Sequence, residues 1–427
     1  MRRRLLTAVA FSFTLYASAQ NYVHQVYVLN EGYFNWQTQE QQVPVSLGSF
    51  DPATGAYQQL MNIEGSRFAS DLLVDEQFVY VAADARLLKF SKDDHALIAE
   101  ADVIGIRKLA IWNDLLLITR GELGGLPHYF EVRNASDLSL VEAITPAEGL
   151  PYSIEDVVVA DGKAWLGVNN AFDAASMTGL VAVIDLGTLE LETTIDLGPN
   201  GLNPEKLMVA DEALYVLNNT DFTQSSISEI DINAMGLQQT IVIANNSGCG
   251  ASALAAQQEK VYYMEYAVNT LARYDISSNT VTDTIQNGVS AYGLIDDPIN
   301  GRMYVTTTDF FSSGELHVME YDGTIGSSVA VGVSPGHLEL DVRSITSVRE
   351  GKAEQLQIMP NPVTDRVRIT GVTKAGAPLR LMDSSGRAIE IDPLPGSGSS
   401  IELNVGSLPA GIYAILLNDR TARFVKQ

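Results

Sequence analysis

Polar and charged side chains recur at a fixed distance ahead of an apolar strand motif that ends near Tyr-Val. The set is Ser70, Asp71, Arg107, Glu155, Asp156, Glu205, Lys206, Ser252, Tyr292 and His337. Acids, bases and an imidazole brought together in a ring could orient a ligand or exchange protons with it. Such ring residues also commonly satisfy one another and bound water. Mutual pairing is therefore the simpler interpretation, ligand orientation the functional one, and catalysis the least favoured.

No catalytic motif accompanies this set. The five histidines are His24, His95, His128, His317 and His337. They are scattered without zinc-ligand spacing, and the sequence contains no HExxH, P-loop or EF-hand pattern. Cys249 is the only cysteine, which rules out an intramolecular disulfide, and no histidine lies near it in sequence. We expect it to be a buried small residue rather than a catalytic thiol.

Aromatic residues occupy segments that the pattern assigns to loops. They are Tyr33, Phe34, Trp36, Phe172, Phe222, Tyr266, Phe310 and Phe311. Because loops are normally polar, aromatics in so many of them are unusual. They could form a stacking surface for a planar or sugar-like ligand, or an anchor patch for a protein partner. The alternative is that each aromatic ring packs on its own segment.

The elements that carry these residues belong to a repeat of roughly 46 residues. Each copy has an upstream strand, a Tyr-Val strand, a loop, a strand ending near Asp, a short turn and a last strand. The seven Tyr-Val strands start at Val26, Phe78, Leu115, Lys163, Ala213, Lys260 and Arg302. Four strands per unit with almost no helical periodicity predict an all-β, seven-bladed β-propeller.

The first copy lacks an upstream strand, and the last copy is followed by an extra strand-like segment, Gly336–Val342. We expect this segment to supply the innermost strand of blade one, which closes the ring and covers a sheet edge. In a four-stranded blade the aromatic loops and the starts of the innermost strands lie on one face. The aromatic rings and the charged ring should therefore crowd one mouth of the channel.

The repeats resemble the YVTN-type surface propellers of Bacteroidetes. YVLNEGYF at Tyr27–Phe34, YVLNN, VAVIDLGTLELETTIDLGPNG and VGVSPG carry the likeness, which runs from residue 26 to about 345. The resemblance implies that the chain binds a small molecule for uptake, since several such propellers bind ligands that include cobalamin. Glu155 and Asp156 resemble the acids with which propeller lactonases hold a divalent metal, but no matching set of Asn and Asp partners is evident. The cofactor stays open, with a divalent cation in the channel as one option.

Short alternating runs and regularly placed glycines after residue 349 predict a small Ig-like β-sandwich. Its motif residues are Pro360, Asn361, Pro362, Gly386, Arg387, Pro409, Gly411, Tyr413 and Lys426. In this order they resemble the type A C-terminal sorting domain of the type IX secretion system of Bacteroidetes. The resemblance implies that the secretion machinery is a partner and that the protein is secreted or held on the outer cell surface.

The N-terminus has the pattern of a secretory signal peptide. Arg2, Arg3 and Arg4 precede an apolar run at residues 5–16, and Ala17-Ser18-Ala19 is a small-residue cleavage site. The apolar run is too short to span a membrane well. The expected domains are residues 1–19, the signal peptide; 20–348, the propeller; and 349–427, the sorting domain.

The 427-residue chain has a formal net charge of −25 at pH 7. Such a charge should repel nucleic acid and anionic membranes, and it favours cationic or neutral ligands or simply solubility. We therefore expect a non-catalytic binding protein that captures a small molecule or a surface protein at the aromatic mouth. One alternative is a metal-assisted lyase or lactonase, in which three or four acid and Asn side chains converge on one ion. Another is a structural surface-layer component that self-assembles.

Overall fold

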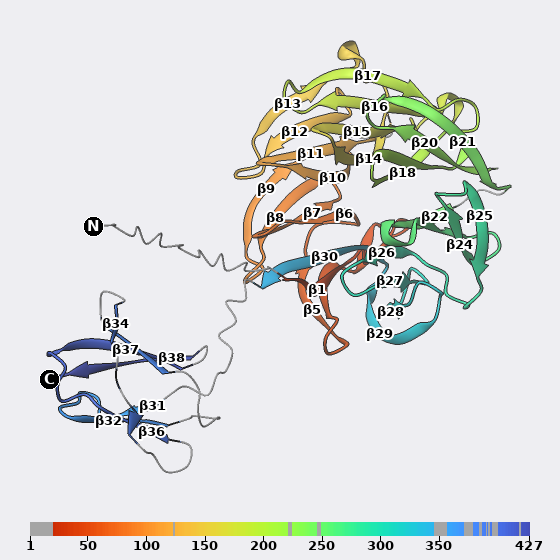
Figure 1. Cartoon of the computed structure of the whole chain (residues 1–427). Coiled ribbons are helices and arrows are strands. Elements are labelled where there is room, and N and C mark those ends of the chain that lie inside the picture. Colours follow the sequence, from red (N-terminus) through yellow and green to blue (C-terminus); the bar gives the residue numbers. More distant parts are fainter. Residues whose placement is uncertain are drawn as a thin grey trace. The chain divides into compact units, whose positions relative to one another are not determined.

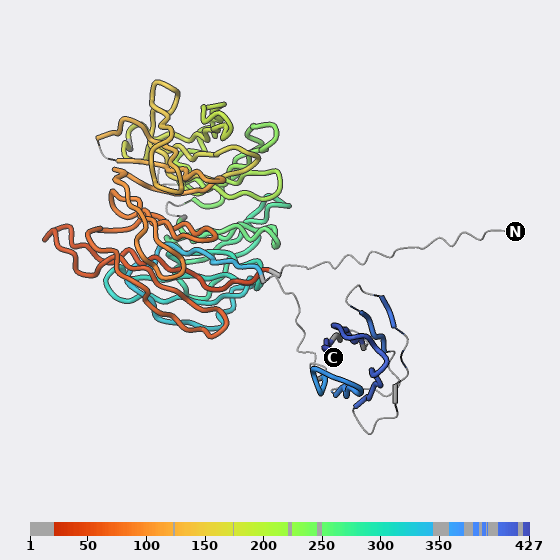
Figure 2. Tube along the Cα trace, turned by 90° about the vertical axis from the view of Figure 1, so that its left-hand side faces the viewer, coloured from red at the N-terminus to blue at the C-terminus, as the bar shows by residue number. Residues whose placement is uncertain are grey.

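The computed structural model describes residues 20–122, 124–220, 224–245, 249–345, 357–370, 379–383, 387–389, 391, 393–394, 400–417 and 420–427. The predicted signal peptide lies outside these residues. The chain forms two compact units, of which one spans Asn21–Ile345 and the other includes Thr346–Gln427 (Figures 1 and 2).

Seven four-stranded antiparallel sheets form the first unit and confirm the predicted seven-bladed propeller. Blade one contains β30 (Pro335–Ile345), β1 (Gln20–Asn30), β4 (Val45–Asp51) and β5 (Ala56–Ile63); blade two contains β6 (Ala69–Val74), β7 (Phe78–Ala83), β8 (Arg86–Ser91) and β9 (Leu97–Asp102). Blade three contains β10 (Ile106–Trp112), β11 (Leu115–Arg120), β12 (Phe130–Asn134) and β13 (Leu140–Ile144); blade four contains β14 (Ile154–Ala160), β15 (Lys163–Val168), β16 (Leu180–Asp185) and β17 (Glu190–Asp196). Blade five contains β18 (Pro204–Ala210), β19 (Ala213–Asn218), β20 (Ser225–Asp231) and β21 (Gly236–Ala244); blade six contains β22 (Cys249–Ala255), β23 (Lys260–Glu265), β24 (Thr270–Asp275) and β25 (Thr280–Ile285); blade seven contains β26 (Gly293–Asp297), β27 (Arg302–Thr307), β28 (Ser313–Met319) and β29 (Ile325–Val333).

The second strand of each blade is buried on both faces, because a neighbouring blade covers each side of the sheet. This explains why these strands read as nearly continuous apolar runs such as ALYVLN in β19, of which all but the first residue are buried. The outermost strands are largely exposed, as β25 shows. The cores lie between blades: Trp165 and Val183 of blade four pack with Leu207 and Leu214 of blade five.

The ring closes as predicted, with strands from both ends of the propeller in one sheet. β30 pairs with β1 and so supplies the innermost strand of blade one (Figure 1). Around the closure, the backbone amides of Glu31 and Gly32 donate hydrogen bonds to the carbonyls of Ser334 and Val333. The closing strand, Pro335–Ile345, is longer at both ends than the predicted Gly336–Val342.

A buried carboxylate ties this closing strand to blade two. Asp341 on β30 is fully buried, and one of its oxygens lies 2.8 Å from the Lys92 ammonium just after β8. Gln25 and Arg343 donate further hydrogen bonds to it. Burial acts against ionisation of Asp341, but the hydrogen bonds from Arg343, Lys92 and Gln25 outweigh it and lower the pKa of the carboxyl.

The second unit contains two four-stranded sheets that share one core. One sheet contains β31 (Gln357–Met359), β32 (Arg366–Thr370), β36 (Ser400–Asn404) and β35 (Pro393–Leu394), and the other contains β34 (Ala388–Ile389), β33 (Leu379–Asp383), β37 (Gly411–Leu417) and β38 (Arg420–Lys426). Val367 and Leu403 of the first sheet pack with Leu381, Ile415 and Phe424 of the second. This is the arrangement of a β-sandwich, as the alternating runs predict.

Outside the sheets, the chain forms a β2 (Tyr33–Asn35) and β3 (Glu40–Val43) hairpin in blade one. The structure also shows short 3-10 helices at η1 (Pro146–Glu148), η2 (Ala174–Ser176) and η4 (Ala256–Gln258). None of the helices in the described part of the chain has the length and apolar character needed to cross a membrane.

We expect Asp341→Ala to lower the free energy of unfolding of the propeller by roughly 3–5 kcal/mol, because it leaves the buried Lys92 ammonium without its counter-charge. Urea denaturation followed by circular dichroism measures the change. The exposed Glu142→Ala variant is the control and should unfold like the wild type. The double variant Lys92→Met/Asp341→Leu should recover most of the loss. If Asp341→Ala lowers the free energy of unfolding no more than the control does, this ion pair does not stabilise the closure of the ring.

Candidate functional site

In blades two to six, the predicted ring residues lie where the innermost strands change register. A β-bulge or irregularity separates Ala69 from Asp71, and equivalent shifts occur in β10, β14, β18 and β22. A bulge turns a side chain out of the regular alternation of a strand. The repeated shift therefore explains how successive blades direct charged side chains into the channel, although each strand is otherwise apolar.

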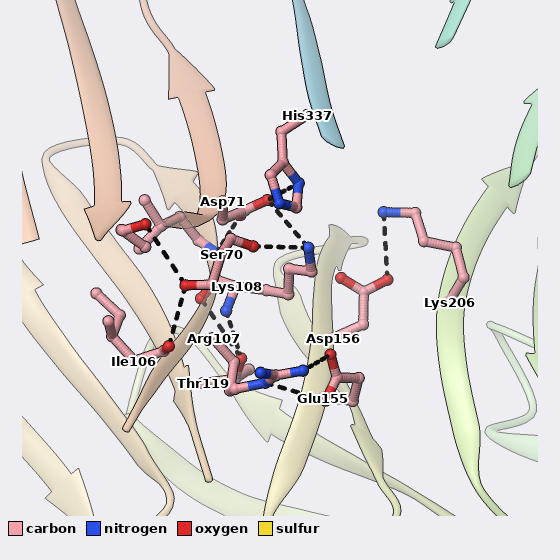
Figure 3. Close-up of polar contacts among 12 residues, drawn as sticks. Ser70, Asp71, Ile106, Arg107, Lys108, Thr119, Glu155, Asp156, Lys206 and His337 are labelled. Atoms are coloured by element: carbon pink, nitrogen blue, oxygen red, sulfur yellow. Dashed lines mark hydrogen bonds and ion pairs between the residues drawn. The ribbon is translucent and has the colours of Figure 1, made fainter. Parts of the chain in front are cut away.

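Three ion pairs join neighbouring innermost strands (Figure 3). They connect Arg107 to Glu155 at 2.5 Å, Lys108 to Asp71 at 3.4 Å, and Lys206 to Asp156 at 3.4 Å. Asp71 and Asp156 also accept backbone hydrogen bonds from Leu109 and Leu207 of the following blade, at 2.7 and 2.8 Å. Mutual pairing therefore accounts for most of the predicted ring. Lys108, which sequence reasoning missed, is the basic partner of Asp71.

Three carboxyl groups remain beside these pairs. Burial is the main cause that raises the pKa of Glu31 to about 7, that of Glu205 to about 7 and that of Glu339 to about 8. Only Glu205 is among the predicted site residues. Glu339 could have been found from sequence, because it follows His337 by two residues in a strand and so faces the same side.

His337 lies between the carboxyl groups of Glu31 and Asp71. Its Nε2 is 3.7 Å from Glu31 and its Nδ1 is 3.8 Å from Asp71. Burial, together with Lys108, Lys206 and Arg107, holds the pKa of His337 well below its ordinary value of 6.5. The imidazole is therefore neutral at pH 7. Tyr292 donates a hydrogen bond of 2.8 Å to Glu31, which stabilises that carboxyl group on its other side.

Two cavities meet at this cluster. The first, which we call the mouth pocket, has a volume of about 490 Å³ and is lined by Tyr33, Phe34, Trp36, Phe68, Phe310 and Phe311, together with polar residues. The second, which we call the channel cavity, has a volume of about 500 Å³ and is lined mainly by polar and charged side chains, including Glu205 and Glu339. Both cavities are lined by Arg107, Lys108 and His337.

The mouth pocket brings together five of the predicted rim aromatics. Tyr33 meets Phe311 edge to face at 5.1 Å between ring centroids, and Phe34 meets Trp36 at 4.9 Å. These rings stay accessible, since Trp36 is 56% and Phe311 63% exposed. Phe68, which sequence reasoning missed, extends the surface next to Trp36.

Arg67 adds a cation to this aromatic surface. Its guanidinium lies 5.1 Å from the centroid of Trp36 and 5.7 Å from that of Phe68. Asp84 forms an ion pair with the same guanidinium at 2.6 Å. The mouth pocket therefore combines a paired charge with accessible aromatic rings, a combination suited to a planar molecule.

The remaining rim aromatics do not join the mouth pocket. Phe172 packs against Gly121 so closely that a Cβ atom there would lie 2.4 Å from its ring, and it lines a separate cavity. Tyr266 packs in the same way against Gly250. Phe222 lies outside the described residues. For Phe172 and Tyr266, packing on the protein's own loops is the better interpretation.

The structure also bears on a metal in the channel. Within the described ranges, no group of three or more His, Cys, Asp and Glu side chains is arranged to hold an ion. Glu205 does have two Asn neighbours, but Asn203 and Asn219 donate their amide hydrogens to it, at 3.0 and 2.6 Å. Their geometry is that of hydrogen bonding to a carboxylate.

The motif residues of the second unit tie its two chain ends together. The Asn361 side chain accepts a hydrogen bond from the Val425 amide at 2.9 Å, and Val363 pairs with Lys426. Tyr413 donates a hydrogen bond of 2.8 Å to the Pro409 carbonyl and stacks on Phe424. Arg387 is exposed, and Gly386 lies outside the described residues. Several motif residues therefore hold β38 in the sandwich.

Residues 357–427 match the family model of the secretion system C-terminal sorting domain. The chain is exported by the type IX secretion system. Its destination is the outer cell surface or the medium. A search of curated proteins gives no match.

Several solved structures share the propeller fold. A functionally unknown protein from Desulfotomaculum acetoxidans aligns with a TM-score of 0.56 at 13% identity, over 74% of this chain and 98% of that chain. A putative 6-phosphogluconolactonase from Bacteroides fragilis gives 0.53 at 14%, over 74% and 98%. The hydrazine synthase of Kuenenia stuttgartiensis gives 0.52 at 12%, over 67% and 99%. At these identities the likeness shows the fold alone.

Deleting residues 353–427 should leave the protein in the periplasm of a bacterium that carries the type IX system, because the sorting domain is the export signal. Cell fractionation and immunoblotting measure the distribution, and resistance to limited proteolysis reports whether the propeller has folded. The full-length Glu142→Gln variant should reach the outside like the wild type. Normal export of the folded deletion variant would contradict the role of this domain.

Thermal stability should fall between pH 5 and 8 in part because of Glu339. Below its ordinary pKa of 4.5 the carboxyl is protonated in both states, whereas up to about pH 8 the folded protein keeps a proton that the unfolded chain releases. Raising the pH through this window therefore destabilises the fold. Differential scanning calorimetry should show a flatter pH dependence for Glu339→Gln than for the wild type. Equal slopes would show that Glu339 titrates normally.

Proposed function

We propose that the protein is a non-catalytic binding protein that captures a planar or sugar-like small molecule at the mouth pocket, outside the cell. The observation that carries this proposal is the group of accessible aromatic rings around a concave space of about 490 Å³. Its size lies within the range of small-molecule sites, which combine aromatic walls with a few polar groups. Export to the surface or the medium agrees with a capture role.

The energetics of the rim support the proposal. Phe310 is 50% exposed, and Trp36 and Phe311 are more exposed still. Burying apolar surface stabilises a protein by about 25 cal/mol for each Å² removed from water, and these exposed rings lack that stabilisation. The rings meet edge to face, so each pair covers one ring face and leaves much of the remaining aromatic surface accessible to a ligand.

The repeats support a finer assignment. We propose that the chain is one of the YVTN-type surface propellers of Bacteroidetes, several of which bind small molecules that include cobalamin. A surface protein is the other candidate partner, since exposed aromatics also serve as anchors at protein interfaces. The concave shape of the mouth pocket favours a small molecule over a flat protein surface.

One observation favours a second candidate, an enzyme of the lyase or lactonase type. Glu31 and Glu205 have pKa values of about 7, which suits general acid or base catalysis near neutral pH. One structure with a similar fold is described as a putative 6-phosphogluconolactonase. Hydrolysis of a lactone that depends on Glu205 would support this candidate. A structural surface-layer role is the third and would show as self-assembly.

The double variant Trp36→Ala/Phe311→Ala should abolish ligand binding and leave thermal stability nearly unchanged, because both rings are exposed and belong to the rim. A thermal-shift screen of the intact protein against cobalamins, haem, oligosaccharides and divalent metals identifies the ligand. Calorimetric titration then compares the variants.

The matched control is Leu97→Ala/Ile98→Ala, which removes two exposed apolar side chains from the outer strand β9. It should bind like the wild type. A large loss of stability in the aromatic variant would favour rim packing. A ligand that binds it with unchanged affinity would contradict the mouth pocket as the site.

A further inference from the structure

The channel cavity has more carboxyl groups than cations to pair with them. Arg107, Lys108 and Lys206 are its basic residues, and each forms an ion pair with Glu155, Asp71 or Asp156. His337 is held neutral by burial and by these same cations, which lower its pKa. Every cation of the described cavity lining is thus engaged.

Glu205 and Glu339 are left over on opposite parts of the ring, one on β18 of blade five and the other on β30 of blade one. Glu205 accepts amide hydrogens from Asn203 and Asn219. Glu339 forms no ion pair with a described Lys or Arg residue, although Lys206 and the Asp71 carboxylate both act on it. Two half-buried acids therefore line one cavity without a counter-charge of their own.

A second feature of the lining also calls for a donor. Asn203 is 1% exposed and lines the channel cavity, and its amide hydrogens already bond to Glu205 and to the Asn219 carbonyl. Its side-chain oxygen has no hydrogen-bond donor among the described residues. A buried acceptor without a donor costs free energy until a donor reaches it. Asn203 donates to Glu205, so this acceptor and the Glu205 carboxyl lie side by side in the cavity lining.

We propose that the channel cavity is a cation subsite that receives a protonated amine carried by the captured molecule. An ammonium group supplies the positive charge that Glu205 and Glu339 lack, and an N–H donor for the Asn203 side-chain oxygen. The inference rests on the proposed function, because the planar part of the same molecule occupies the adjoining mouth pocket. Arg107, Lys108 and His337 lie where the two parts of such a molecule join.

Proton linkage gives this subsite a distinct signature. Glu205 and Glu339 have pKa values of about 7 and about 8, and the charges around them are Glu155 and Arg107 for Glu205, and Asp71 and Lys206 for Glu339. At pH 7 the two carboxyls hold protons that a neighbouring ammonium displaces. Binding of an amine therefore releases about one proton, and affinity rises between pH 6 and 8.5.

The test uses three probes that share an indole ring and differ in charge: tryptamine, 3-ethylindole and indole-3-propionate. Calorimetric titration of the intact protein in phosphate and in HEPES at pH 7 gives both affinity and proton release. We expect tryptamine to bind about tenfold more tightly than 3-ethylindole, since a charge-assisted hydrogen bond contributes that much or more. Indole-3-propionate should bind most weakly.

Glu205→Gln/Glu339→Gln should lose the preference for tryptamine and the proton release while it keeps the affinity for 3-ethylindole, which also shows that it is folded. Glu142→Gln/Glu190→Gln removes two carboxylates from the outer strands β13 and β17 and controls for the overall negative charge. This control should behave like the wild type.

Equal binding of the three probes would overturn the cation subsite and leave the mouth pocket standing. A tryptamine preference that survives in Glu205→Gln/Glu339→Gln would overturn it as well. If Trp36→Ala/Phe311→Ala still prefers tryptamine and binds it with full affinity, the result would uphold the cation subsite. It would overturn the aromatic mouth as the binding site. Failure of every probe to bind at millimolar concentration would count against both.

Discussion

Closure of the ring is the constraint on which the rest of the propeller depends. β30 and β1 come from opposite ends of the unit, and their pairing completes blade one. Without it, blades one and seven would each present an open face. The seven innermost strands surround a channel only when the ring is closed. With no disulfide available to a chain that has one cysteine, this non-covalent closure must be held by backbone pairing, by the cores between blades and by the buried Asp341.

The same closure sets the chemistry of the channel. His337, Glu339 and Asp341 occupy every second position along β30 and so face the same side of the strand. They interact with groups from blades one and two as the strand crosses the propeller. At one end, Asp341 meets Lys92 and is ionised. Toward the mouth, Glu339 has no such partner, and burial raises its pKa. One strand therefore holds a charged carboxylate for stability and a nearly neutral one beside an open cavity, and the presence of a basic partner makes the difference.

Sequence reasoning reached the fold because the blade repeats its pattern of apolar strands and polar turns. The ring residues follow from the same repeat, since each occupies an equivalent position before a Tyr-Val strand. It failed where the outcome depends on contacts between blades. Phe68 and Lys108 carry no signal of their own, and they matter because Trp36 and Asp71 happen to lie beside them. Phe172 and Tyr266 look like rim aromatics in sequence, but they lie against Gly121 and Gly250, where the lack of a Cβ atom leaves room for their rings.

The net charge of the chain and the charges of its site must be kept apart. A value of −25 suggests an evenly acidic surface, yet the mouth pocket is lined by Arg67, Arg107 and Lys108. These cations are neutralised by Asp84, Glu155 and Asp71, so they order the lining without making it attractive to anions. The field that remains at the channel comes mainly from the acidic body around it, because raised pKa values leave Glu205 and Glu339 only partly ionised near pH 7. That field draws a cation toward the channel, and the aromatic rim lies at its mouth.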